Sequence, residues 1–268
     1  MRLVLLTDLH FGRAQPELVQ PLLDRVAQAD PDLVMIAGDF VQRARSGQFR
    51  MACAFLQRLG RDWIAVPGNH DIPLYNLLAR LVAPRRAFRR WIAPETEPEV
   101  DTAAARIIGL DTTCRWHHQR GRISRAQIDR VCRALDAEAG RRTVILLAHH
   151  PFHHRPDVEK KVMIGGAEAL DRWSGCGPHV ILSGHLHSWA VEPFVARKSR
   201  SMTLQVHCGT GLSNRLRHEP NDFAVIDVEE DRFAVRRMAA DAATCTFVER
   251  GRSFYRRTAE GWRDLRTG

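Results

Sequence analysis

Side chains that can bind metal ions or transfer protons are concentrated in five short segments of this 268-residue chain. Each segment directly follows a short apolar run that is typical of a buried strand. The segments are Thr-Asp-Leu-His at 7–10, Gly-Asp at 38–39, Pro-Gly-Asn-His-Asp at 67–71, His-His-Pro at 149–151 and Gly-His-Leu-His at 184–187. Ligands of open α/β sheets bind just beyond the carboxyl ends of the strands. We therefore expect the five segments to form one site.

Seven of these side chains are candidate metal ligands. Carboxylate oxygens mixed with imidazole nitrogens favour Mn²⁺, iron or Zn²⁺ over Ca²⁺. Seven ligands are too many for one ion and suit two, with four ligands each if Asp39 bridges the pair. Positions would remain for a shared hydroxide and for a substrate oxygen. The seven candidates are Asp8, His10, Asp39, Asn69, His149, His185 and His187.

The spacing of these residues predicts how they converge. Asp8 and His10 are two positions apart, so on an extended backbone both side chains would point to one face. His185 and His187 repeat this spacing. Glycine permits the tight turns and the close backbone approach that such a site requires, and it occurs at Gly38, Gly68 and Gly184.

The elements that must position these residues alternate between strands and helices. Predicted strands cover residues 2–6, 33–37, 63–66, 106–110, 144–148, 180–183, 204–207, 223–228 and 233–237. Predicted helices cover residues 16–29, 49–59, 74–82, 124–139 and 167–173, and a capping box of Ser124 and Gln127 starts the fourth of them. This order predicts a layered α/β domain with a mixed sheet. Residues 84–104, which have weak periodicity, are expected to be a surface insertion.

The chain is expected to form one domain over residues 1–240. Residues 241–268 are expected to form a C-terminal hairpin extension packed on the same domain, with a turn near Glu260. This extension would serve as an edge strand or as a dimer contact.

Composition narrows the class of protein. There are 40 Lys and Arg against 31 Asp and Glu, a net charge of +9, but only three of the 40 are Lys. We interpret the arginine excess mainly as solvated surface, so nucleic acid is not the expected partner. No apolar run approaches the roughly 18 residues of a membrane span. The six cysteines are scattered and no signal peptide is visible, which favours a cytoplasmic protein.

The densest basic run follows the segment that contains His70. Phe88 and Trp91 are interleaved in it. The run either overhangs the site, where it would recruit an anionic head group, a nucleotide or an acidic membrane surface, or forms a solvated helix face. Its arginines are Arg80, Arg85, Arg86, Arg89 and Arg90.

The order D-x-H, G-D, G-N-H-D, H-H-P, G-H-x-H over residues 7–187 resembles the calcineurin-like metallophosphoesterases. Within this superfamily the chain looks most like the short bacterial branch that includes cyclic-nucleotide and glycerophosphodiester phosphodiesterases. The resemblance implies a four-layer α-β-β-α sandwich of two mixed β-sheets. It also implies two divalent ions, manganese or iron with zinc as an alternative. One ion would bind Asp8, His10, Asp39 and His187, and the other Asp39, Asn69, His149 and His185.

The resemblance further implies hydrolysis of a small or lipid-linked phosphodiester by in-line attack of a hydroxide that bridges the ions. His70 would donate a proton to the leaving oxygen. Asp71 either holds the His70 imidazole or caps the next helix. A phosphomonoesterase, a pyrophosphatase of a nucleotide-sugar lipid and a nuclease are alternatives on the same site. A scaffold without activity is disfavoured, because all seven ligands and His70 are present.

Overall fold

The computed structural model describes residues 1–138, 141–154, 158, 160–177, 179–195, 202–217 and 219–265. The six helices of this part are α1 (Pro16–Ala29), α2 (Ser46–Arg58), α3 (Leu77–Val82), α4 (Arg86–Trp91), α5 (Arg125–Glu138) and α6 (Gly166–Cys176). Its strands are β1 (Arg2–Leu6), β2 (Leu33–Ala37), β3 (Trp63–Val66), β4 (Glu99–Asp101), β5 (Ala105–Leu110), β6 (Thr143–Ala148), β7 (His179–Ser183), β8 (Ala190–Val195), β9 (Met202–His207), β10 (Asp222–Val228), β11 (Arg232–Asp241), β12 (Thr246–Thr258) and β13 (Gly261–Asp264).

The strands form one mixed sheet whose two halves face each other. The strand order is β3-β2-β1-β10-β11-β12-β13-β9-β7-β6-β5-β4, and β8 pairs with β9 off this path. β1, β2 and β3 are parallel in the first half, as are β5, β6, β7 and β9 in the second. β13 joins the halves, because Gly261 pairs with Met202 of β9.

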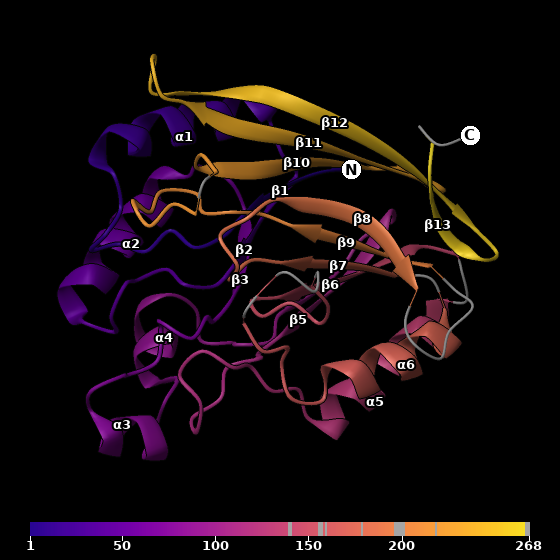
Figure 1. The fold of residues 1–268 in the computed structure, drawn as a ribbon, viewed down its shortest axis with the longest axis horizontal. Coiled ribbons are helices and arrows are strands. Elements are labelled where there is room, and N and C mark those ends of the chain that lie inside the picture. Colours follow the sequence, from indigo (N-terminus) through magenta and orange to yellow (C-terminus); the bar gives the residue numbers. More distant parts are fainter. Residues whose placement is uncertain are drawn as a thin grey trace.

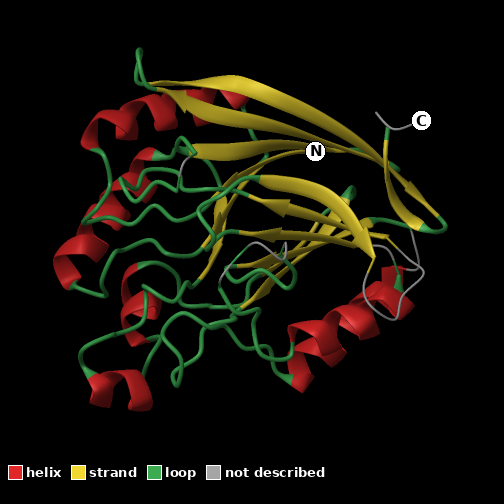
Figure 2. Cartoon of the chain, in the orientation of Figure 1, coloured by secondary structure: helices red, strands yellow, loops and turns green. Residues whose placement is uncertain are grey.

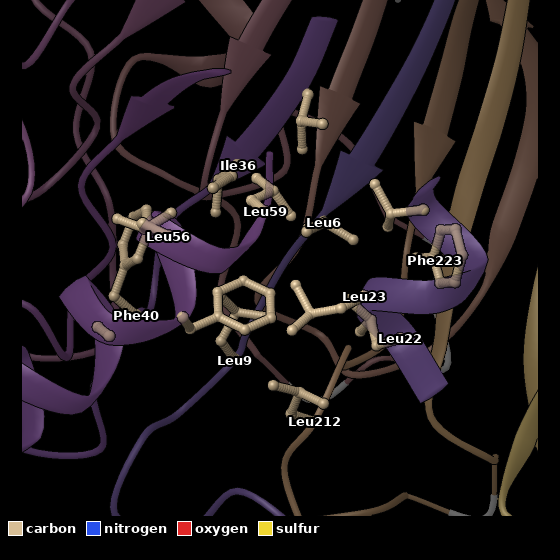
Figure 3. Close-up of a cluster of buried hydrophobic side chains, with 14 of the residues drawn as sticks. Leu6, Leu9, Leu22, Leu23, Ile36, Phe40, Leu56, Leu59, Leu212 and Phe223 are labelled. Carbon is tan, nitrogen blue, oxygen red and sulfur yellow. The ribbon is translucent and has the colours of Figure 1, made fainter. Parts of the chain in front are cut away.

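Alternation along β1 shows how the first half is covered on both faces. Val4 and Leu6 pack into a buried cluster with residues of α1 and α2, whereas Leu3 and Leu5 enter a cluster that contains residues of both halves. Figure 3 shows the first cluster, with Leu22 of α1 gathered beside the strands. The sheet therefore buries both faces, as its continuous apolar strands require.

The second half is covered in the same way. Ile145 and Leu147 of β6 face the shared cluster, whereas Leu146 and Ala148 pack with residues of α5 and α6. The order of layers is helices, sheet, sheet and helices, with α1 and α2 on one outer side and α5 and α6 on the other (Figure 1). The predicted α-β-β-α fold is confirmed, and its two predicted mixed sheets are the two halves of one hydrogen-bonded sheet.

The predicted surface insertion at residues 84–104 is wrong in part. This segment contains α4 and β4. Phe88 of α4 is fully buried in the first cluster, where its ring lies 5.9 Å from that of Phe40. Helix α4 has only six residues, of which three are arginines, so the segment is too short for a helical period to be detected from the sequence.

The chain after residue 241 forms β12 and β13, with their turn at 259–260. Trp262 of β13 is fully buried against Phe233, with ring centroids 5.6 Å apart. The expected hairpin thus joins the two halves of the sheet and is not an edge, because β12 pairs with β11 and β13 pairs with β9. The division into residues 1–240 and 241–268 stays a prediction.

The buried His179 at the start of β7 is expected to weaken the fold at acid pH. Burial lowers the pKa of His179 from its ordinary value to about 4. Below about pH 6.5 the unfolded chain binds a proton that the native chain excludes until about pH 4, so stability falls as the pH falls. We expect this group to remove about 2 kcal/mol of unfolding free energy between pH 8 and pH 5.

Urea unfolding of the His179→Gln variant at both pH values measures this contribution. The variant should lose about 2 kcal/mol less than the wild-type chain over that interval. The exposed His117 offers a matched His→Gln control that should behave as the wild type does. An unchanged pH dependence in the His179 variant would contradict the prediction.

Candidate metal centre

The five segments with metal-binding or proton-transferring side chains meet at the carboxyl ends of β1, β2, β3, β6 and β7. The loops gather there beside the strands (Figure 2). All seven candidate ligands lie in this one place, and none is more than 7% exposed. Their ligand atoms form overlapping clusters in which a metal ion could be held. The structure therefore brings together every residue that the sequence singled out as a ligand.

The first group of ligand atoms surrounds the Nε2 atom of His187. This atom lies 3.1 Å from Asp8 Oδ1 and 3.1 Å from His10 Nε2. The distance from His10 Nε2 to Asp8 Oδ1 is 3.5 Å. Asp8 is fully buried, and its Oδ1 atom has no hydrogen-bond partner. An unpaired buried carboxylate oxygen is costly unless a cation compensates it.

The second group surrounds the Nε2 atom of His149. This atom lies 3.1 Å from Asn69 Oδ1 and 3.2 Å from His185 Nδ1. Asp39 lies between the groups, since its Oδ2 atom is 3.7 Å from His10 Nε2 and 3.4 Å from His149 Nε2. One carboxylate oxygen thus faces both clusters.

Two backbone carbonyls set the tautomers of the central histidines. His149 Nδ1 donates to the carbonyl of Ala37 at 2.7 Å, and His187 Nδ1 donates to that of Arg215 at 3.0 Å. When both rings are neutral, as binding to a metal ion requires, each Nε2 lone pair points at oxygen and nitrogen atoms that also carry lone pairs. A cation between them would remove this repulsion, so the donor set fits a metal ion.

The pKa of His149 agrees with a site that attracts cations. Burial by itself would lower the pKa of His149, but the Asp39 carboxylate outweighs burial and raises the pKa to about 9. The same negative charge that attracts a proton to this nitrogen would attract a divalent cation.

The backbone departs from the extended conformation that the two-residue spacing suggested. Five of the seven ligands have left-handed φ values: Asp8 (52°), His10 (48°), Asp39 (54°), His185 (76°) and His187 (58°). The prediction that an extended backbone directs these side chains to one face is therefore wrong. A left-handed residue turns the chain as it leaves the strand. Such residues each cost on the order of 1–3 kcal/mol and cluster at functional sites.

Glycine is required where these loops cross. A Cβ atom at Gly68 would overlap the Asp39 carboxylate and backbone nitrogen. One at Gly184 would overlap the Thr7 hydroxyl and the Asp8 carboxylate. The predicted close approach of the backbone to the ligands is confirmed at both positions.

His70 lies at the edge of the ligand cluster. Its Nδ1 donates to the carbonyl of Gln42 at 2.8 Å, and its ring is perpendicular to that of His10 with centroids 4.9 Å apart. Its backbone N–H donates to Asp39 Oδ1 at 2.8 Å. Burial lowers the pKa of His70 to about 4. The ring is therefore neutral at pH 7 in the free chain, and the Gln42 carbonyl orients it.

Neither predicted contact of Asp71 forms among the described residues. The Asp71 carboxylate accepts from the backbone N–H of Val41 at 3.1 Å and from that of Gly68 at 2.8 Å. The cap of α3 is Asn76, whose side chain accepts from Ala79 N. Asp71 therefore ties the loop after β2 to the loop after β3, and the carbonyl that orients His70 comes from a residue with no sequence signal.

Sequence reasoning also missed Lys160. Its Nζ donates to the carbonyl of His185 at 2.6 Å and lies 3.3 Å from His185 Nε2. The only available signal was its rarity, since it is one of three lysines. Arg155, which follows His149 by six positions in the sequence, is outside the described residues.

The basic run does not overhang the metal centre as a unit. Arg80 is buried, and Arg85 forms an ion pair with Asp111 at 2.7 Å. Arg86, Arg89 and Arg90 line a separate cavity of about 1180 Å³ beside α4 and α5. Different arginines flank the site, in a cavity of about 760 Å³ that also contains Gln42, namely Arg13, Arg43, Arg45 and Arg215.

Comparisons with known proteins agree with this arrangement. The family model described as calcineurin-like phosphoesterase matches residues 1–189. A probable cyclic nucleotide phosphodiesterase of Rhodopseudomonas palustris is 24% identical over 292 aligned positions, which cover 95% of each chain. The 3',5'-cyclic adenosine monophosphate phosphodiesterase CpdA of Escherichia coli K12 is 23% identical and covers 78% of this chain and 79% of its own.

Two solved structures share the fold. A purple acid phosphatase from yellow lupin seeds superposes with a TM-score of 0.68 at 12% identity, and covers 99% of this chain but 54% of its own. Vacuolar protein sorting 29 of Cryptosporidium parvum superposes with a TM-score of 0.51 at 15% identity, with 95% and 97% coverage. The family match and the buried Asp, Asn and His residues together confirm the resemblance noted in the sequence. The chain belongs to the calcineurin-like phosphoesterase family and is a phosphoester hydrolase.

Proposed function

We propose that the chain is a phosphodiesterase with two divalent metal ions, which hydrolyses a small or lipid-linked phosphodiester. The observation that carries this proposal is the position of Asp39, whose Oδ2 atom faces His10 Nε2 and His149 Nε2 in two neighbouring ligand clusters. A single carboxylate shared in this way is what a pair of ions requires.

The proposed ligands divide around Asp39. Asp8, His10 and His187 would hold one ion, and Asn69, His149 and His185 the other. We propose that both ions are manganese or iron, because the ligands combine oxygen atoms with imidazole nitrogen atoms. Two bound ions supply a water of lowered pKa and a clamp for phosphoryl oxygens.

The residues around the ions would bind and orient the substrate. The arginine-lined cavity of about 760 Å³ is within the size range of small-molecule sites. No described carboxylate forms an ion pair with its four arginines, so this cavity favours an anion. Arg43 connects this cavity to the metal centre, because the Nη1 atom of Arg43 lies 3.2 Å from the Nδ1 atom of His70. His70 Nε2 is then the atom that would pass a proton to the leaving oxygen.

The two similar phosphodiesterases favour a phosphodiester substrate over a phosphomonoester. The two relatives are named as phosphodiesterases of cyclic nucleotides, which makes 3',5'-cyclic nucleotides the first compounds to test. A monoester, a nucleotide-sugar lipid pyrophosphate and DNA are the alternative substrates for the same site.

Metal analysis combined with hydrolysis of bis(p-nitrophenyl) phosphate tests the proposal. The chain reconstituted with Mn²⁺ or Fe²⁺ is expected to bind two ions and to hydrolyse this diester at least tenfold faster than p-nitrophenyl phosphate. Cyclic AMP belongs in the same assay. A chain that binds no metal and shows no turnover would overturn the proposal, and a preference for the monoester would assign it to the phosphomonoesterases.

A further inference from the structure

Helix α3 is oriented with its apolar residues outward and its charged residue inward. Leu77, Leu78 and Val82 are 65%, 74% and 73% exposed, whereas Arg80 is 5% exposed. A helix on the surface of a globular protein normally shows the opposite arrangement. The helix lies at the edge of the molecule, away from the strands (Figure 1).

Four backbone carbonyls hold Arg80 in this orientation. Its guanidinium donates to the carbonyls of Pro73 at 2.9 Å, Cys114 at 3.0 Å, Arg115 at 2.7 Å and His117 at 2.7 Å. A buried cation is tolerated only when its donors are satisfied. These bonds therefore fix α3 against the loop at 114–117, and they keep the apolar side chains of the helix on the surface.

The same loop presents a further large apolar side chain. Trp116 is 68% exposed, and Arg115 Nη1 donates to the carbonyl of Leu81 at 2.7 Å. Trp116 also lines the cavity of about 1180 Å³ together with Val82. We use the term α3 patch for Tyr75, Leu77, Leu78, Leu81, Val82 and Trp116, which are all exposed. Large exposed apolar side chains that gather on one short helix and on the loop bonded to it favour an interaction site.

Four arginines lie beside one end of the α3 patch. Arg86, Arg89, Arg90 and Arg115 line the same cavity as Val82 and Trp116, and none of the four forms an ion pair within the described residues. The acidic residues of this cavity are Glu97 and Asp111, which are paired with Arg130 and Arg85. The uncompensated charge beside the patch is therefore positive.

We propose that the α3 patch and these four arginines dock the protein on the surface of an anionic lipid bilayer. Leucine, tryptophan and tyrosine side chains would enter the region of the headgroups, while the arginines contact lipid phosphates. No described helix of this chain has the length and apolar character of a membrane span. Docking would thus occur at the surface of the bilayer.

The docked surface lies next to the proposed catalytic residues. The guanidinium of Arg43 lies 5.9 Å from the centre of the Tyr75 ring, and its Nη1 lies 3.2 Å from His70 Nδ1. A phosphodiester of a bilayer lipid would reach the metal centre from this side. This point rests on the proposed function, whereas docking itself does not.

Cosedimentation with vesicles tests the docking surface. The wild-type chain is expected to bind vesicles of phosphatidylglycerol and phosphatidylcholine at least tenfold more tightly than vesicles of phosphatidylcholine alone, and to lose binding in 0.5 M salt. Leu78→Gln with Val82→Gln should weaken binding to the anionic vesicles at least tenfold. Arg86→Gln with Arg89→Gln and Arg90→Gln should remove the preference for anionic lipid.

Met51→Gln on α2 is the matched control, since Met51 is another exposed apolar side chain at 51% exposure. It should bind vesicles as the wild-type chain does. Hydrolysis of water-soluble bis(p-nitrophenyl) phosphate by the Leu78 and Val82 variant should be unchanged, which separates docking from catalysis. Absence of wild-type binding to anionic vesicles would overturn the proposal. A dimer that the same variant dissociates would assign the patch to a second copy of the chain.

Discussion

Replacing Asp39 with asparagine is expected to reduce bound metal from two ions to at most one per chain and to lower kcat by about 10³-fold. The Asp39 Oδ2 atom faces both ligand clusters, so in the proposed site Asp39 would be the ligand that the two ions share. Its charge also contributes most to raising the pKa of His149 against the effect of burial. Metal analysis and the diester assay measure the two effects.

The metal-free Asp39 variant should remain folded. An asparagine oxygen can still accept from the backbone N–H of His70, as Asp39 Oδ1 does. The increase in Tm on addition of Mn²⁺ should be smaller than in the wild-type chain, because that increase reports binding to the native state. Asp136→Asn on the exposed surface of α5 is the matched control and should retain two ions. Two ions and full activity in the Asp39 variant would contradict the shared-ligand assignment.

Replacing His70 with alanine is expected to leave both ions bound and to lower kcat by about 10²–10⁴-fold. His70 lies beside His10 but is oriented by the Gln42 carbonyl, so its removal leaves the ligand set intact. The acid role requires a protonated ring, and the charge of a bound phosphate would favour that form over the neutral ring of the free chain.

A series of aryl and alkyl phosphodiesters separates this role from simple positioning. Loss of a proton donor should be most severe for alkoxide leaving groups and mildest for p-nitrophenolate, which needs no proton. His117→Ala, at an exposed histidine of a nearby loop, should behave as the wild-type chain does. An equal loss across the series would instead indicate that His70 only positions the substrate.

Much of the fold could be predicted because its elements have strong local signals. β1, β2, β3 and α1 have the predicted bounds, and Ser124 and Gln127 form the predicted capping box. The sequence did not predict elements that few buried side chains hold in place, such as α4, where Phe88 is fully buried. Short segments of this kind depend on contacts with distant parts of the chain, which periodicity does not record.

The roles of the arginines at 80–90 also could not be predicted from the sequence. Sequence alone could not separate Arg80, which is buried on four carbonyls, from Arg86, Arg89 and Arg90, which line a cavity. All have the same chemistry and occur within eleven positions. Their roles differ because the loop at 114–117 is folded against α3 and supplies acceptors to only one of them.

The sequence by itself determined which chemical groups stand at the ends of the strands, because apolar runs and the polar residues after them are local properties. Tertiary structure decided how those groups are presented. The carbonyl that sets the tautomer of His149 belongs to Ala37, 112 residues away. Asp71 bonds the loop after β2 to the loop after β3, and the backbone N–H of His70 in the second loop donates to Asp39 of the first. Orientation, burial and shared ligation depend on such long-range contacts, which no spacing along the chain encodes.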